Sequence, residues 1–150
     1  MQCTIEARPE TLARGSRNVH GVLVVRLGDH VFPDAQWNDF VPIVLNWWPA
    51  EMTELVAARA TNGRFRFMDG PYELQIDRDE ARIRLVRKEI AGDDLIAGDK
   101  IDLPAFAQSL LAAAESVHAA CSERDLVDAE SRALPKAVAD LRRVLMARLK

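Results

Sequence analysis

The sequence has few cysteines and no long apolar run. Its two cysteines, Cys3 and Cys121, are far apart and belong to no CxxC or Cys/His cluster. This usage argues against a disulfide framework and predicts a reduced, cytoplasmic setting. No stretch of about 18 apolar residues is present, so we expect no membrane span. The first ten residues contain acids and no apolar segment, so we predict no signal peptide.

The common catalytic and metal-binding signatures are also missing. The sequence has no glycine-rich phosphate loop, no HExxH, no GxSxG and no paired CxxC. Histidine is the side chain whose ordinary pKa suits proton transfer near neutral pH, and the chain has three. His20 and His30 fall at expected strand ends, while His118 flanks an apolar helical stripe that contains Cys121. We therefore predict no catalytic residue, no cofactor and no metal, which favours a binding protein over an enzyme.

The overall composition is that of an ordinary globular protein. Of the 150 residues, 49% are hydrophobic and 29% are charged, so the chain can bury a full core. This length predicts a single domain over residues 1–150. With 20 basic and 23 acidic residues the net charge is −3, which argues against a dedicated nucleic-acid binder.

The N-terminal region indicates strands. Residues Gln2–Arg8 predict a first strand, and residues 9–18 (PETLARGSRN) predict a loop because they contain Pro, Gly, Ser and Asn. His20–Leu27 is a valine-rich run, typical of a strand that is covered on both faces. A Gly-Asp turn follows, and His30–Phe32 is a candidate return strand.

Residues 64–88 predict a three-stranded meander. The segment RFRFMDGPYELQID alternates apolar and polar residues on both sides of a Gly-containing turn, and EARIRLVRK continues the alternation. Four arginines are expected on the outward face: Arg64, Arg66, Arg82 and Arg84. We expect Glu73 among them in cross-strand pairs. Because the aromatic residues of these strands point inward, base stacking is missing and nucleic-acid binding is disfavoured.

Residues 37–60 (WNDFVPIVLNWWPAEMTELVAARA) predict a helix. At 100° per residue, seven apolar side chains share one face: Trp37, Val41, Val44, Leu45, Trp48, Met52 and Leu55. Pro42 fits the first turn if Asn38 or Asp39 is the N-cap, and Pro49 is expected to kink or restart the helix. A strand over Phe40–Trp48 is the competing prediction, which Pro42 disfavours.

The C-terminal third predicts helices. Asp102 is placed to cap a helix whose apolar face consists of Leu103, Phe106, Leu110, Ala113, Val117 and Cys121. Ser122 and Asp125 resemble a capping box for a further helix, in which Pro135 marks a kink or a new start. Its apolar stripe consists of Leu134, Val138, Leu141, Leu145 and Leu149. Together these elements predict an α+β fold, a mainly antiparallel sheet with one inserted helix and C-terminal helices packed on one face.

The segment Leu27–Ala58 carries the strongest functional signal. It contains all three tryptophans and five acids, but no lysine or arginine. Phe40, Ile43 and Trp47 form a second apolar helix face, which must be covered by the C-terminal helices or by a partner. Aromatic anchors ringed by negative charge are typical of a site that binds a basic protein. The alternative interpretation is a fully buried helix with scattered acids. The predicted partner-binding residues are Asp34, Trp37, Asp39, Trp47, Glu51 and Glu54.

Two segments carry a family resemblance. Residues 32–48 (FPDAQWNDFVPIVLNWW) and 65–76 (FRFMDGPYELQI) resemble small uncharacterised bacterial proteins, some of which are similar to immunity proteins of polymorphic toxin systems. The resemblance implies a bacterial cytoplasmic inhibitor that binds a toxin, and it assigns no functional residue. Two alternatives remain open. One is a homo-oligomeric small-ligand-binding protein, with the Leu134–Leu149 stripe or the second face of the Trp-rich helix closing a dimer. The other is an enzyme.

Overall fold

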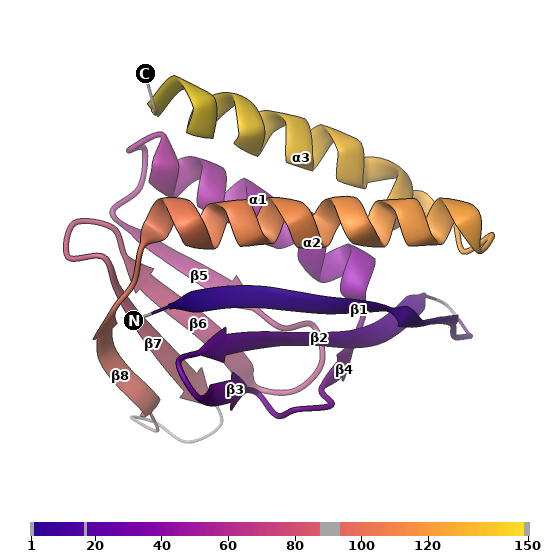
Figure 1. The fold of residues 1–150 in the computed structure, drawn as a ribbon, viewed down its shortest axis with the longest axis horizontal. Coiled ribbons are helices and arrows are strands. Elements are labelled where there is room, and N and C mark those ends of the chain that lie inside the picture. The colour runs from indigo at the N-terminus through magenta and orange to yellow at the C-terminus, as the bar shows by residue number, and fades with distance from the viewer. Residues whose placement is uncertain (1, 17, 88–93, 149–150) are drawn as a thin grey trace.

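The computed structural model describes residues 2–16, 18–87 and 94–148, with the backbone alone for 94–99. Within these ranges the chain forms two antiparallel sheets and three helices (Figure 1). The first sheet contains β1 (Cys3–Arg14), β2 (Val19–Leu27), β3 (His30–Phe32) and β4 (Asn38–Asp39). The second contains β5 (Asn62–Arg66), β6 (Tyr72–Asp77), β7 (Arg82–Arg87) and β8 (Asp94–Lys100). The helices are α1 (Val41–Val56), α2 (Leu103–Glu123) and α3 (Ala129–Arg148). The predicted α+β class is confirmed.

Strand β2 is the centre of the first sheet, with β1 on one side and β3 and β4 on the other. Its consecutive residues Val22, Leu23, Val24 and Val25 are all buried, so both faces of the strand are covered, as the apolar run predicts. The return strand at His30–Phe32 is also confirmed.

The loop predicted over residues 9–18 is largely wrong, because β1 continues to Arg14. Pairing with β2 is interrupted after Arg8 and resumes at Ala13, so the extra residues form a bulge. At this bulge the Thr11 hydroxyl accepts a 2.8 Å hydrogen bond from the Val22 backbone N–H, which replaces a ladder bond. The loop-like composition therefore marks an irregular hairpin end rather than an open loop.

The predicted meander forms the second sheet, which has one more strand than expected. Phe65, Ile83 and Leu85 are buried on its inner face, and the four arginines named above are exposed on its outer face, as predicted. The added strand is β8, which pairs antiparallel with β7. Its sequence, DLIAGDK, contains a glycine and three acidic or basic residues and lacks a clear period of two.

Helix α1 begins after Phe40, later than either predicted cap. Asn38 and Asp39 instead form β4, which pairs with β2. Pro42 lies in the first turn as expected, where its missing N–H costs nothing. The helix neither restarts nor ends at Pro49, whose carbonyl accepts a 2.7 Å bond from Thr53 Oγ1. The competing strand over residues 40–48 is thus wrong.

The helices form successive layers over the sheets. Helix α1 packs on β2 and β5, α2 packs on β1, and α3 packs on α1 and α2 (Figure 1). The Asn46 amide of α1 donates to the Glu130 carbonyl at the start of α3, at 2.7 Å. The C-terminal helices therefore cover one flank of α1, while Trp47 stays 45% exposed.

The leucine stripe of α3 is buried inside the chain rather than presented to a second copy. Its members Leu134, Val138, Leu141 and Leu145 are at most 5% exposed. Leu149, the last predicted member, lies outside the described residues. The helix runs through Pro135 without a new start. A dimer closed by this stripe is therefore disfavoured, since α1 and α2 already occupy it.

The capping box lies at different residues from those predicted. Asp102 caps α2 by accepting from the Ala105 N–H at 3.1 Å, as expected. Ser122, however, lies inside α2, and α3 begins at Ala129. There the Asp128 carboxylate accepts from the Ser131 N–H at 2.8 Å, and the Ser131 hydroxyl accepts from the Asp128 N–H at 3.0 Å.

This assignment is tested by two alanine variants. We expect Asp128→Ala to lower the free energy of unfolding by about 1 kcal/mol, because it leaves N–H groups at the start of α3 unbonded. Ser122→Ala should be neutral or slightly stabilising, because alanine is favoured inside a helix. Urea unfolding followed by circular dichroism measures both. A larger loss in Ser122→Ala than in Asp128→Ala would contradict the assignment.

Candidate protein-binding surface

The predicted site residues Trp37 and Asp39 form a structural joint. The Asp39 carboxylate accepts bonds from Trp37 Nε1 at 2.9 Å, from the Phe40 N–H at 2.7 Å and from the Asp69 N–H at 3.2 Å. Asp39 is 1% exposed, so it cannot contact a partner. The joint ties β4 and the start of α1 to the loop between β5 and β6.

Aromatic packing completes this joint. The Trp37 ring lies edge-on to Tyr72, with ring centroids 5.2 Å apart. It also packs closely over Gly70, where an added Cβ would lie 2.8 Å from the indole. Gly70 has φ +74°, so both the turn and the close approach require glycine there. The Asp-Gly-Pro-Tyr turn is therefore dictated by packing on Trp37.

Burial raises the pKa of Asp39 above its ordinary value, although the three N–H donors partly oppose the shift. The nearby negative charge of Asp69 acts in the same direction as burial. Burial of the Asp39 carboxylate therefore costs free energy, and its hydrogen bonds offset part of this cost. This arrangement favours a structural role for Asp39.

The remaining predicted acids are dispersed. Asp34 is exposed and accepts from the Gln36 N–H at 2.9 Å, within its own turn. Glu54 is exposed and forms a 2.6 Å ion pair with Arg59. Among the predicted acids, only Glu51 lines a surface depression together with Trp47. The ring of acids expected around the tryptophans is not formed.

Arginines lie beside Trp47 instead. A surface depression of about 300 Å³ is lined by Trp47 and Glu51 of α1 and by Arg64 and Arg66 of β5. We call these four residues the Trp47 surface. The expectation that no aromatic residue lies beside the arginine face is wrong, because Trp47 of α1 lies next to Arg64 and Arg66 of β5.

Helix α1 covers part of the edge of β5 at this surface. Strand β5 is an edge strand, so its outer N–H and C=O groups would otherwise be open to another strand. The Arg64 N–H donates to Glu51 Oε1 at 3.0 Å, and Trp48 Nε1 donates to the Arg66 carbonyl at 2.7 Å. These two bonds occupy part of the outer edge of β5, so contacts through side chains are favoured over pairing with a further strand.

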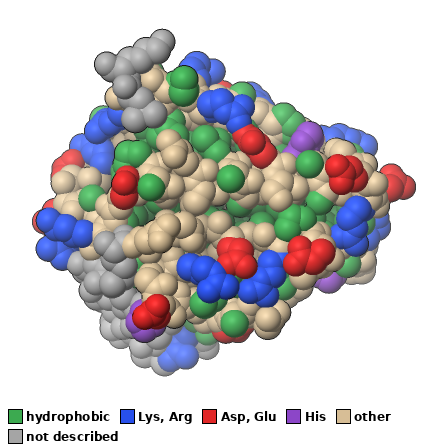
Figure 2. Space-filling view, viewed as in Figure 1, with side chains coloured by type: hydrophobic (Ala, Val, Ile, Leu, Met, Phe, Trp, Pro, Cys, Tyr) green, Lys and Arg blue, Asp and Glu red, His purple; other side chains and the backbone are tan. Residues whose placement is uncertain are grey.

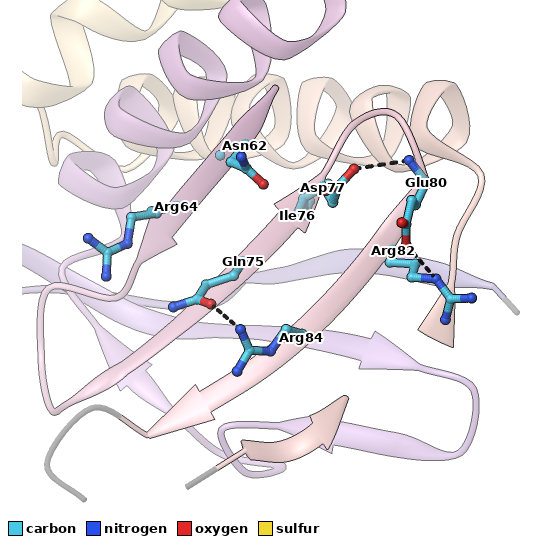
Figure 3. Close-up of a pocket in the computed structure, with 9 residues that line it drawn as sticks. Asn62, Arg64, Gln75, Ile76, Asp77, Glu80, Arg82 and Arg84 are labelled. Carbon is cyan, nitrogen blue, oxygen red and sulfur yellow. Dashed lines mark hydrogen bonds and ion pairs between the residues drawn. The ribbon is translucent and has the colours of Figure 1, made fainter. Parts of the chain in front are cut away.

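A second hollow of about 420 Å³ adjoins this surface through Arg64 and lies on the outer face of β5, β6 and β7 (Figure 3). Arg84 donates to the Gln75 side chain at 3.1 Å, and Arg82 pairs with Glu80 at 3.0 Å. The expected pairing of Glu73 with this face is confirmed by its 3.1 Å contact with Arg64, but the Glu73 side chain is 2% exposed. The acid is thus covered while the arginine is half-exposed.

The face that carries α2, β1 and β2 looks different. Figure 2 shows basic and acidic side chains intermingled there. Among them, Glu6 accepts bonds from both Arg8 and Arg26, and these contacts lower its pKa. Such surface ion pairs satisfy each other, so this face offers fewer unpaired groups to a partner.

Metal binding, membrane spanning and similarity to known proteins are three further properties of the chain. Within the described residues, no group of three or more His, Cys, Asp or Glu is placed to hold a metal ion. In the same part of the chain, no helix has the length and apolar content needed to cross a membrane. No protein-family model, curated protein or solved structure matches the chain.

The pKa shift of Asp39 predicts a specific pH dependence. Because its pKa is higher in the folded than in the unfolded state, the wild type loses stability as pH rises from about 3.9 through the folded pKa. The side chain that Asp39→Asn introduces does not titrate. The free energy of unfolding of the wild type minus that of Asp39→Asn should therefore fall as the pH rises over that range. Asp34→Asn, at an exposed position, is the control, and the same difference between the wild type and this variant should change less. Urea unfolding from about pH 3 to pH 7 measures this difference, and a rise instead of a fall would refute it.

Proposed function

We propose that this chain is a non-enzymatic protein-binding module that contacts its partner through the Trp47 surface. The observation that carries the proposal is the 45% exposure of Trp47 beside two arginines. Exposure of an indole to water is unfavourable, and neither α2 nor α3 covers the exposed side of Trp47. The contrast with Trp48, which is fully buried, supports a role for Trp47 outside the core.

The composition of the Trp47 surface supports a protein partner. Tryptophan and arginine are the residue types most enriched among those that contribute most to binding free energy. Arginine and aromatic side chains are also enriched in interface cores relative to the remaining surface. Helix α1 and strand β5 fix the backbone positions from which these side chains project, so the spacing between the tryptophan and the arginines is set before binding.

The resemblance to immunity proteins suggests a specific form of this function. We propose that the module inhibits a bacterial toxin by binding to it in the cytoplasm. Both cysteines are free and buried, and burial raises the pKa of Cys3 to about 12, so neither is suited to redox chemistry. The thiols therefore act as small core side chains.

The binding surface is tested with Trp47→Ala. We expect affinity for the partner to fall about 30-fold, equivalent to about 2 kcal/mol, because a central anchor is removed. The matched control is Met146→Ala, which truncates an apolar side chain that is 56% exposed on α3. The tagged variants are compared in pull-downs from the organism that encodes the chain, and the partner is then purified for calorimetry. Equal capture by wild type and Trp47→Ala would refute the surface.

Inhibition is tested by co-expression. If the captured partner is a toxin, its expression alone should stop growth, and co-expression of the wild-type chain should restore growth. Trp47→Ala should restore growth less well, while Met146→Ala should act as the wild type. Failure of the wild type to protect against its purified partner would refute the inhibitor role but not binding. Capture of the chain itself alone would indicate a homo-oligomer instead.

A further inference from the structure

The polar groups that the Trp47 surface leaves unbonded indicate the chemistry of the partner. This inference rests on the proposed function. We infer that the Trp47 surface binds an acidic segment of the partner, with its carboxylates on Arg64 and Arg66 and an apolar side chain on Trp47. This differs from the basic partner predicted from the acids of residues 27–58, because the structure does not gather those acids around the tryptophan.

The two arginines present unused donors. Arg64 bonds the buried Glu73 through Nε, at 3.1 Å, and within the described residues its two terminal nitrogens bond no other group. Across the same described ranges, the Arg66 side chain has no ion pair or hydrogen bond. Guanidinium groups bind carboxylates through paired N–H donors. Two such groups on one side of an exposed indole therefore favour a segment that carries both carboxylates and an apolar residue.

The acid of the Trp47 surface and the acid beside it are already engaged. Glu51 accepts from the Arg64 backbone N–H at 3.0 Å, and Glu73 is buried beneath the arginine that it bonds. The exposed side of the surface is therefore richer in donors than the residue count indicates. A basic partner would place its positive charges beside the guanidinium groups of Arg64 and Arg66, which is unfavourable.

A nucleic acid fits this surface less well. The adjoining hollow contains Asp77 and Glu80, and the Glu80 side chain is 65% exposed. A phosphate backbone carries charge at every nucleotide, so it would bring phosphates close to these acids. An acidic peptide segment places its charges only where the arginines lie. Glu51 and Trp48 also occupy part of the outer edge of β5, which hinders addition of the segment as a further strand and favours contacts through side chains.

The three tryptophans provide a selective readout. The indole N–H groups of Trp37 and Trp48 are bonded to Asp39 and to the Arg66 carbonyl, whereas Trp47 is the most exposed of the three. In a ¹⁵N-labelled sample each gives a separate indole signal, and Trp47→Phe assigns that of Trp47. The probes are three peptides of equal length and equal leucine content, with acidic, neutral or basic remaining residues. A short single-stranded DNA is the fourth probe.

We expect the acidic peptide to shift the Trp47 indole signal more than the other probes do, and less at high salt. Arg66→Glu should weaken its binding about tenfold. This variant should fold, because the Arg66 side chain bonds no described group. The matched control is Arg132→Glu on α3, another exposed arginine, which should bind as the wild type does.

Several results would overturn this inference. They are a larger shift with the basic or neutral peptide, no shift with the acidic peptide, tighter binding of the DNA, or unchanged binding by Arg66→Glu. The two proposals fail separately. If Trp47→Ala loses the captured partner while Arg66→Glu retains it, the binding surface stands and the acidic segment is wrong. If Trp47→Ala retains the partner, the proposed surface itself is wrong.

Discussion

The burial of α1 is the constraint on which the rest of the structure depends. The helix is apolar over a wide arc, so one sheet cannot cover it, and it lies between the strands on one side and α3 on the other. Trp48 anchors it, since its ring packs edge-on to Phe65 and Phe67 with centroids 6.0 and 5.0 Å apart. The layering of the C-terminal helices follows from the need to cover the remaining flank.

The helices also cover part of one edge of each sheet. On β5 this is done by Glu51 and Trp48, and on β1 the Ile5 N–H donates to the Ser109 hydroxyl of α2 at 3.0 Å. Open edges invite pairing with other chains, and these bonds hinder such pairing. The same contacts that protect β5 hold Trp47 and Arg64 side by side. The contacts that protect the edge of β5 therefore also position the Trp47 surface.

Acidic residues have a different meaning in the fold from the one their number suggests. Asp39 accepts three N–H groups, Glu51 accepts one from a strand edge, and Glu73 lies beneath Arg64. Each is used to satisfy donors that would otherwise be unbonded. The arginines of β5 are left to face outward, which is why the local chemistry near Trp47 favours carboxylates although the chain as a whole is acidic.

Features that depend on local periodicity and capping are predictable from the sequence. These are the meander at residues 64–87, the valine strand, a helix within residues 37–60 and the Asp102 cap, because alternation and helical spacing are properties of neighbouring residues. The bulge in β1, the added strand β8 and the neighbours of Trp47 are not predictable in this way. These depend on pairing between distant segments: Trp47 and Arg64 come from different elements, and no spacing rule relates them. The burial of Asp39 is likewise set by the loop that packs on it.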